Sequence, residues 1–166
     1  MLIQITEIDA AAVDRLFAVY AESMEDLSAN FDSADEMRAG YAGFLREFIR
    51  EPGQSVLVET DGDKWVSALR AIEYRPGVWF IEAVETAPDR RGQGFGRRLL
   101  THASERLVSL GAKRIECIIH PDNTASQRLH AACGFVPTND EPVNCWNETE
   151  TGCVKWRYIP GRTGEE

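Results

Sequence analysis

The spacing of apolar and polar residues predicts the elements of the first third of the chain. Apolar and polar side chains alternate over residues 2–6, which predicts a strand. Apolar residues then recur every third or fourth position, which predicts a helix from Ala10 to Leu27 with Asp9 as its N-cap. A polar gap at 28–33 precedes a second helix, which ends at Glu51-Pro52-Gly53. The apolar face of this second helix comprises Tyr41, Phe44, Leu45, Phe48 and Ile49.

Two tight turns, Asp61-Gly62-Asp63 and Pro76-Gly77, predict an antiparallel meander in the middle of the chain. Helical spacing and two closing glycines then predict two more helices. In order, the segments are strands at 55–60, 64–75 and 78–86, a helix with apolar residues from Leu99 to Val108 that ends at Gly111, a strand at 114–119, a helix at 123–133 closed by Gly134, and a hairpin of strands at 143–148 and 153–159.

This order of elements, β-α-α-β-β-β-α-β-α-β-β, predicts one mixed α/β domain. The chain has 166 residues and about 150 per domain is usual, so we expect a single domain over 1–160 and a frayed tail at 161–166. No apolar run approaches the ~18 residues that a membrane span needs, so no membrane partner is expected. The first ten residues do not resemble a signal peptide, which favours a cytoplasmic protein.

The charge balance is acidic, with 27 Asp and Glu residues, 18 Lys and Arg residues and a net charge of −9. Nucleic-acid binding usually leaves a basic footprint, so a nucleic-acid partner is not expected. An acidic protein suits a cationic substrate, although acidity also serves solubility alone. The 4 cysteines have spacings that match no metal site or small disulfide framework, so we expect reduced thiols and no metal.

A basic, glycine-rich segment after the third meander strand carries the clearest chemical signal. Three alternate glycines lie directly before an amphipathic helix, and arginines surround them. Amide groups at a helix start are unpaired and bind phosphate, and glycine lets the backbone approach an anion. The spacing is neither that of a Rossmann fingerprint nor that of a P-loop, and a polyphosphate ligand is predicted. The residues are Arg91, Gly92, Gly94, Gly96, Arg97 and Arg98.

This segment and a second one resemble two motifs of a known family. Arg91-Gly92-Gln93-Gly94-Phe95-Gly96 is similar to the (Gln/Arg)-x-x-Gly-x-(Gly/Ala) signature of the GNAT superfamily of acyl-CoA-dependent N-acyltransferases. Residues 123–135, which begin with Asn123 and end in Gly134-Phe135, resemble its second motif. The resemblance covers about 55–135. It implies the GNAT fold, with a mixed, mostly antiparallel sheet of six to seven strands and four helices, and acetyl-CoA as the acyl donor.

The resemblance also implies which residues bind coenzyme A. Backbone amides of the glycine-rich segment would hold the pyrophosphate, and the end of strand 78–86 would pair with the pantetheine amides like an added strand. Asn123 and Ser126 would reach the pantetheine arm near the thioester, although both are ordinary helix-capping residues as well. The full expected set is Val84, Glu85, Thr86, Arg91, Gly92, Gln93, Gly94, Phe95, Gly96, Arg97, Asn123 and Ser126.

Direct acetyl transfer needs a base for the ammonium proton and an acid for the departing thiolate. The family usually has a Tyr as the acid, and His130 stands at that position here. A protonated imidazole is a competent donor, and the alternative is a histidine that only packs behind the cofactor. Glu82 is the expected base or ammonium anchor, with Glu85 as the alternative. Strand alternation places these two carboxylates on opposite faces unless a bulge intervenes.

The expected acceptor is a primary amine on a small cationic molecule, aminoglycoside- or polyamine-like. Certain aminoglycoside 6′-N-acetyltransferases look similar around Glu82 and His130. An acidic cluster on the first two helices would suit such an acceptor, although a solvated helix face is the commoner meaning. Its members are Glu22, Glu25, Asp26, Asp32, Asp35 and Glu36.

Other functions stay open at this point. Acetylation of protein, peptide or amino-acid amines is one alternative. A non-catalytic acyl-CoA-sensing module and a nucleotide-binding domain are others. A monomer or a homodimer is expected, and the four tryptophans are expected to pack on sheet faces. They are Trp65, Trp79, Trp146 and Trp156.

Overall fold

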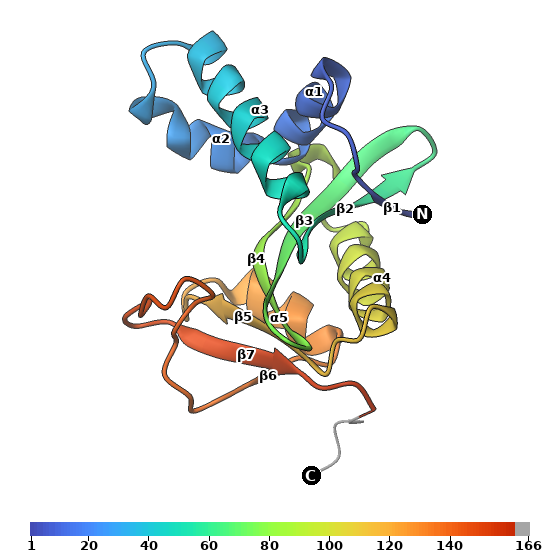
Figure 1. Cartoon of the computed structure of the whole chain (residues 1–166), viewed down its shortest axis with the longest axis vertical. Helices are drawn as coiled ribbons and strands as arrows, with labels where there is room; N and C mark the ends of the chain where they lie inside the picture. The colour runs from blue at the N-terminus through green and yellow to red at the C-terminus, as the bar shows by residue number, and fades with distance from the viewer. Residues whose placement is uncertain (162–166) are drawn as a thin grey trace.

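The computed structural model describes residues 1–161 and is built on one twisted sheet, with the strand order β1-β2-β3-β4-β5-β7-β6 (Figure 1). Neighbouring strands are antiparallel except β4 and β5, which are parallel. The prediction of a mixed, mostly antiparallel sheet is confirmed. The strands are β1 (Leu2–Gln4), β2 (Gln54–Asp61), β3 (Lys64–Arg75), β4 (Val78–Thr86), β5 (Arg114–Ile119), β6 (Val136–Pro137) and β7 (Val154–Tyr158).

The sheet opens between β4 and β5. Residues 78–80 of β4 pair with 114–116 of β5, and beyond them β4 runs on to Thr86 with no further β5 partner in the described register. The two strands part at this point, and α5 (Thr124–Ala132) lies beside the opening (Figure 1). The free edge of β4 and the start of α5 therefore face the same space.

Helices cover both faces of the sheet. Asp9 and Ser33 begin α1 and α3 with side-chain oxygens that accept from the amides of Ala12 and Glu36, at 2.7 and 3.1 Å. The short 3-10 helices are η1 (Ser28–Asn30) and η2 (Pro88–Arg90). The remaining helices are α1 (Ala10–Val19), α2 (Ala21–Leu27), α3 (Ala34–Arg50) and α4 (Phe95–Ser109).

The first predicted helix, 10–27, is divided in two at Tyr20, which accounts for a fifth helix where four were expected. The backbone of Tyr20 has φ −90° and ψ 26°, and α2 continues in a different direction from α1 (Figure 1). No glycine or proline stands at this position, so the helical periodicity of the sequence carries no sign of the break. The bend leaves the Tyr20 ring buried at the junction, 2% exposed.

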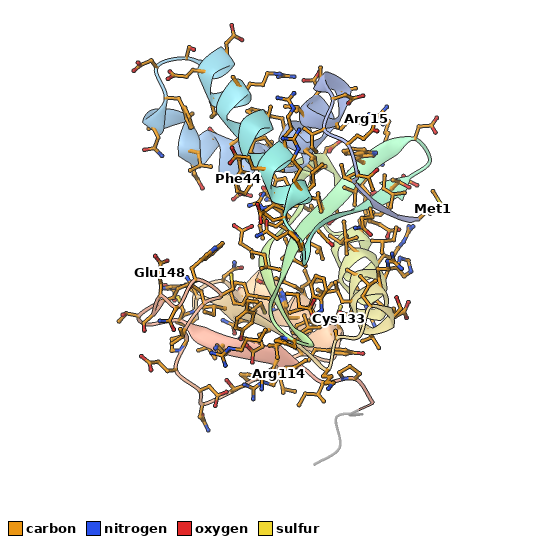
Figure 2. The ribbon with its side chains drawn as sticks, in the orientation of Figure 1. Met1, Arg15, Phe44, Arg114, Cys133 and Glu148 are labelled. Carbon is orange, nitrogen blue, oxygen red and sulfur yellow. The ribbon has the colours of Figure 1, made fainter. Side chains whose placement is uncertain are left out.

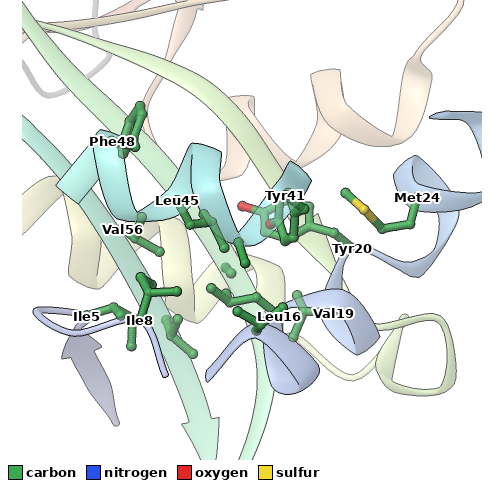
Figure 3. Close-up of a cluster of buried hydrophobic side chains, with 14 of the residues drawn as sticks. Ile5, Ile8, Leu16, Val19, Tyr20, Met24, Tyr41, Leu45, Phe48 and Val56 are labelled. Carbon is green, nitrogen blue, oxygen red and sulfur yellow. The ribbon is translucent and has the colours of Figure 1, made fainter. Parts of the chain in front are cut away.

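Two hydrophobic cores lie on opposite faces of the sheet. One core packs α1, α2 and α3 against β2 and β3 (Figure 3), and the other packs α4 against the opposite face and β5. Alternate residues of β2 enter different cores, because successive side chains of a strand point to opposite faces: Val56 and Val58 enter the first and Leu57 the second. Apolar residues on both faces of the central strands thus contribute to both hydrophobic cores.

The C-terminal hairpin differs from its prediction. Residues 143–148 form no strand and do not pair with 153–159; Val143 makes only an isolated bridge to Thr149, which lies outside both predicted strands. The side chain of Asn144 organises this loop, because its Oδ1 accepts from the amides of Trp146 and Glu148 at 3.0 Å each. β7 pairs instead with β5 and the short β6. Residues 162–166 of the expected tail lie outside the described part of the chain.

The change from strand to loop at residues 143–148 affects one of the four tryptophans. Trp79 and Trp156 are buried in the second core, and Trp65 packs partly buried against the first, as predicted. Trp146 is 55% exposed on the loop, so its expected place on a sheet face is wrong. Its position follows from the hydrogen bonds of Asn144, which the alternation of side chains does not reveal.

Candidate active site

The glycine-rich segment forms the start of α4, close against the end of β4. Gly94 precedes the helix with φ 84°, a left-handed conformation that glycine adopts without strain, and no side chain caps the helix there. A Cβ on Gly96 would come within 3.1 Å of Thr86 Oγ1 on β4. The glycines therefore bring the uncapped amides of α4 directly beside the strand end, as phosphate binding requires.

A groove of about 630 Å³ runs along this segment. It is lined by the glycine-rich turn, by the end of β4 and by the start of α5. Of the twelve residues expected to bind the cofactor, all but Gln93 line this groove. The side chain of Gln93 instead donates to the Asp89 carbonyl at 3.2 Å.

Arg91 brings positive charge to the groove and is held there by acidic residues. Its guanidinium pairs with Glu22 of α2 and lies 3.6 Å from Glu85 Oε1, and its Nε donates to the Thr86 carbonyl at 3.2 Å. The Arg91 and Glu22 side chains are about half exposed, at 47% and 60%. A phosphate in the groove would therefore meet Arg91 in competition with carboxylates.

A second cavity, of about 540 Å³, adjoins the groove. The helices α2 and α3 cover it, and β3, β4, β5 and α5 form its floor and far side. In Figure 2, Phe44 on α3 lies above the region where β4 leaves β5, and Glu148 on the loop before β7 lies to its left. Groove and cavity meet at residues that line both, namely Ser23, Val84, Glu85, Asn123 and Ser126.

A β-bulge brings Glu82 into this cavity together with Glu85. The β3–β4 register passes from Arg70 opposite Ala83 to Ala71 opposite Ile81, so Glu82 is the extra residue. Without the bulge these two carboxylates would point to opposite faces. The sequence did not decide whether a bulge occurs here. The structure contains it, and both carboxylates line the cavity.

The carboxylate of Glu82 is engaged by Arg70 of β3. Arg70 Nε and Nη2 donate to Glu82 Oε2 and Oε1 at 2.5 and 3.2 Å, a two-point pairing. The Arg70 guanidinium lies between the rings of Tyr20 and Phe44, 5.1 and 5.2 Å from their centroids. Sequence reasoning missed Arg70, although a charged residue between Leu69 and Ala71 in an otherwise apolar strand was a signal.

The carboxylate of Glu85 has a freer oxygen. Its Oε2 accepts from the hydroxyl of Ser23 on α2 at 2.6 Å, whereas its Oε1 is buried without a hydrogen-bond partner among the described residues. The side chain is 11% exposed. Glu85 therefore has one oxygen held by Ser23 and one that accepts no hydrogen bond from the described residues and has the Arg91 guanidinium 3.6 Å away.

His130 is buried on α5 with one ring nitrogen held and the other open. Nδ1 lies 2.8 Å from the carbonyl oxygen of Ser126, which can only accept, so Nδ1 carries a proton. Burial lowers the pKa of His130, despite the opposing effect of this carbonyl. The ring is therefore neutral at pH 7, and Nε2, which lines the cavity region without a partner in residues 1–161, presents a lone pair.

Asn123 caps the start of α5, which is one of the two roles that the sequence suggests for it. Asn123 Oδ1 accepts from the Ser126 amide at 3.1 Å. Asn123 and Ser126 also line both the groove and the second cavity. Asn123 therefore caps the helix and lies at the candidate site as well. The acidic cluster of α2 and α3 behaves differently, because its members are exposed and none of them lines the second cavity.

Two further features are absent from residues 1–161. No helix in this part of the chain has the length and apolarity to cross a membrane. The same residues contain no group of three or more His, Cys, Asp or Glu side chains that could hold a metal ion.

Comparison with known proteins places this geometry among acetyltransferases. The sequence profile of the acetyltransferase (GNAT) family matches residues 16–135. The phosphinothricin N-acetyltransferase of Alcaligenes faecalis is 34% identical over 128 residues, a match that covers 72% of this chain and 62% of that protein. The aminoglycoside N(6')-acetyltransferase type 1 of Serratia marcescens is 38% identical over 61 residues, 37% of this chain and 42% of that protein. The chain thus matches less than two thirds of the length of both curated relatives.

A solved structure supports the fold over nearly the whole chain. An acetyltransferase from Bacillus subtilis, crystallised in complex with CoA, superposes with a TM-score of 0.63 at 18% identity. The superposition covers 95% of this chain and 97% of that chain. At this identity the likeness concerns the fold.

Proposed function

The chain belongs to the GNAT family of acetyltransferases, and from this premise we propose that it transfers an acetyl group from acetyl-CoA directly to a primary amine of a small acceptor. The observation that carries the proposal is the meeting of two spaces. A groove beside an uncapped helix start, suited to a pyrophosphate, joins a separate cavity that holds two carboxylates and a histidine.

The groove is proposed to bind coenzyme A through backbone groups. The amides of residues 93–97 would hold the pyrophosphate, with Arg91 and Arg97 as countercharge. The edge of β4 beyond residue 80, which β5 leaves unpaired, would pair with the pantetheine amides through Val84 and Thr86. This arrangement points the thioester toward Asn123 and Ser126, where groove and cavity meet.

The carboxylates in the cavity are proposed to receive the ammonium group of the acceptor and its first proton. Glu82, the base favoured by the sequence, stays a candidate, acting directly or through water. Both of its oxygens accept hydrogen bonds from Arg70, whereas Glu85 Oε1 accepts none and has only the longer 3.6 Å contact with Arg91. This difference favours Glu85 for the first contact with the ammonium, with Glu82 holding Arg70.

His130 is proposed to carry the second proton. As the amine nitrogen bonds to the thioester carbon and the C–S bond breaks, one proton must leave nitrogen and one must reach sulfur. A neutral imidazole with a bare Nε2 can accept the first and then donate it to the thiolate. The expected acid role of His130 is thus retained, preceded by a step as acceptor.

For the acceptor class, the aminoglycoside relative and the two carboxylates support the small cationic acceptor expected from the sequence. Acetylation of protein, peptide or amino-acid amines is the second candidate. A purely acyl-CoA-sensing module would need neither the carboxylates nor the open Nε2.

Acetyl-CoA-dependent thiol release tests the proposal, measured against aminoglycosides, polyamines, amino acids and short peptides. Release that depends on one acceptor class supports an N-acetyltransferase and names the class. The turnover of the variants Glu85→Gln and Glu82→Gln then identifies the base. The base is the carboxylate whose replacement abolishes acceptor turnover while acetyl-CoA affinity is unchanged. Acetyl-CoA binding without turnover of any acceptor would favour the sensing module, and absence of acetyl-CoA binding would refute the proposal.

A further inference from the structure

Buried polar atoms without partners are concentrated in the second cavity. Within the described residues eight such side-chain atoms occur, and five belong to residues that line this cavity. Leaving a buried donor or acceptor unpaired is costly, so such a concentration indicates groups that are paired by a ligand. The five atoms are Tyr20 Oη, Tyr41 Oη, Arg70 Nη1, Glu85 Oε1 and His130 Nε2.

These atoms divide into two kinds. Glu85 Oε1 and His130 Nε2 are acceptors, and the proposed function assigns both to the amine. Arg70 Nη1 can only donate, and neither phenol has a part in proton transfer to or from the amine. The proposed reaction therefore uses one side of the cavity and leaves three hydrogen-bonding groups unexplained.

Arg70 is fixed so that one end of its guanidinium stays open. Nε and Nη2 are occupied by Glu82, and the guanidinium carbon lies over the rings of Tyr20 and Phe44, 5.1 and 5.2 Å from their centroids. Only Nη1 remains for a partner. The Glu82 carboxylate offsets much of the Arg70 charge. Arg70 would therefore bind an anion mainly through hydrogen bonds from Nη1, and less through long-range electrostatic attraction.

The two phenols lie beside this open end and keep their protons. Figure 3 shows the Tyr20 and Tyr41 side chains next to each other, from the α1–α2 junction and from α3. Burial raises the pKa of Tyr41 to about 12 although the Arg70 guanidinium works against the rise, and burial raises the pKa of Tyr20 as well. Each phenol therefore keeps an O–H that it can donate, and neither hydroxyl has a hydrogen-bond partner within residues 1–161.

We infer that the acceptor carries a negatively charged group as well as its primary amine, and that Arg70, Tyr20 and Tyr41 bind this anion while Glu85 receives the ammonium. The chemical class is a small zwitterion, an amino acid or an analogue with a carboxylate-like anion. Glu85 lines both the cavity and the groove, whereas Arg70, Tyr20 and Tyr41 line the cavity alone, so an acceptor with its ammonium at Glu85 and its anion at these donors has a defined orientation. The inference rests on the proposed function and, of its two acceptor candidates, selects amino-acid amines over the polycationic ones.

Acceptors that differ only in the anion test the inference. Thiol release is measured with a series of amino acids, their amides and the corresponding decarboxylated amines, with spermidine and an aminoglycoside as polycations. We expect kcat/KM to be at least about tenfold higher for the zwitterions, the usual effect of a charge-assisted hydrogen bond. Equal or faster turnover of amides, amines or polycations would overturn the inference while leaving the acetyltransferase proposal intact. Turnover of no acceptor would overturn both.

Variants that keep the aromatic rings locate the anion site. The double variant Tyr20→Phe/Tyr41→Phe removes two hydroxyls that have no protein partner, so folding should be retained. We expect its KM for a zwitterion to rise about tenfold, with kcat and acetyl-CoA affinity little changed. Tyr74→Phe is the matched control, because that phenol donates to Glu116 at 2.5 Å, outside the residues that line the cavity.

Competitive inhibition by an acceptor analogue that lacks the amine tests the anion site independently. A simple carboxylate of matching length should inhibit competitively against the zwitterion, and the double variant should lose that inhibition. Inhibition of equal strength in both proteins, or an unchanged KM in the double variant, would place the anion elsewhere and refute the assignment.

Discussion

Ser23 on α2 donates a hydrogen bond to Glu85 Oε2 on β4 at 2.6 Å. The contact joins residues 62 positions apart and connects the helix that covers the cavity to the strand whose end borders the groove. It leaves Glu85 with one oxygen directed by the protein and one open. The placement of α2 therefore bears directly on the carboxylate proposed to receive the ammonium.

Ser23→Ala should accordingly weaken use of the acceptor without weakening cofactor binding. Loss of one hydrogen bond to a charged group suggests a fall in kcat/KM for the acceptor of about tenfold. The measurement is steady-state thiol release together with acetyl-CoA affinity by calorimetry. Ser28→Ala is the control, because Ser28 bonds only to the Glu25 carbonyl on the exposed end of α2. An equal effect of both substitutions would show that the Glu85 contact has no special role.

His130 predicts a pH dependence of stability with a definite sign. Burial lowers its pKa in the folded protein, so between that pKa and the unfolded value of about 6.5 the unfolded chain binds more protons. The stability that His130 contributes in its neutral form is complete above about pH 6.5 and is lost as the pH falls through this window. Melting temperatures from pH 8 to 5 should therefore fall less steeply for His130→Gln than for the parent protein.

The same group predicts the pH profile of catalysis. If neutral Nε2 accepts a proton, kcat should hold across neutral pH and fall only below the ordinary histidine range. His130→Gln should lower kcat by about 10²-fold or more, since general acid–base catalysis contributes that much. A parent profile that declines from pH 6 to 8 would instead mean that protonated His130 is the required form.

The close approach of α4 to β4 predicts the effect of a single methyl group. Gly96→Ala would place a Cβ 3.1 Å from Thr86 Oγ1 and 3.5 Å from Leu129, which should push the helix start away from the strand. Acetyl-CoA affinity should fall by about three- to tenfold, because the amides bind phosphate by position. Gly43→Ala on α3 meets nothing within 4 Å and should stabilise the protein by about 0.5–1 kcal/mol. Unchanged acetyl-CoA affinity in Gly96→Ala would contradict the assignment of the groove.

The pairing of Glu22 with Arg91 predicts a gain of cofactor affinity on removal of a charge. Glu22→Gln frees Arg91 for the pyrophosphate, so acetyl-CoA should bind about two- to fivefold more tightly at low salt, within the range of an exposed ion pair. The gain should shrink as salt rises. Glu25→Gln removes the same charge three residues further along α2 and serves as the control. If both variants gain equally, the effect comes from the general acidic field and not from Arg91.

Short-range patterns were sufficient for most elements and for the groove. The meander of β2, β3 and β4 and the glycine-rich start of α4 follow from periodicity, turn residues and backbone chemistry that act over a few residues. The two places where the fold departs from its prediction lack such local signals. Tyr20 interrupts a helix without glycine or proline, and Asn144 replaces a strand by a loop through side-chain hydrogen bonds.

The sequence by itself determined the family resemblance, the two-faced sheet and most residues of the groove proposed to bind the cofactor, because each depends on local spacing. Only the tertiary structure decided which atoms meet in the second cavity. The bulge at Glu82 brings both carboxylates to one face, Arg70 then occupies Glu82, and the turn at Tyr20 buries its phenol beside them. These partners come from the α1–α2 junction, β3 and β4, and a contact between elements far apart in the chain leaves no periodic trace in any one of them.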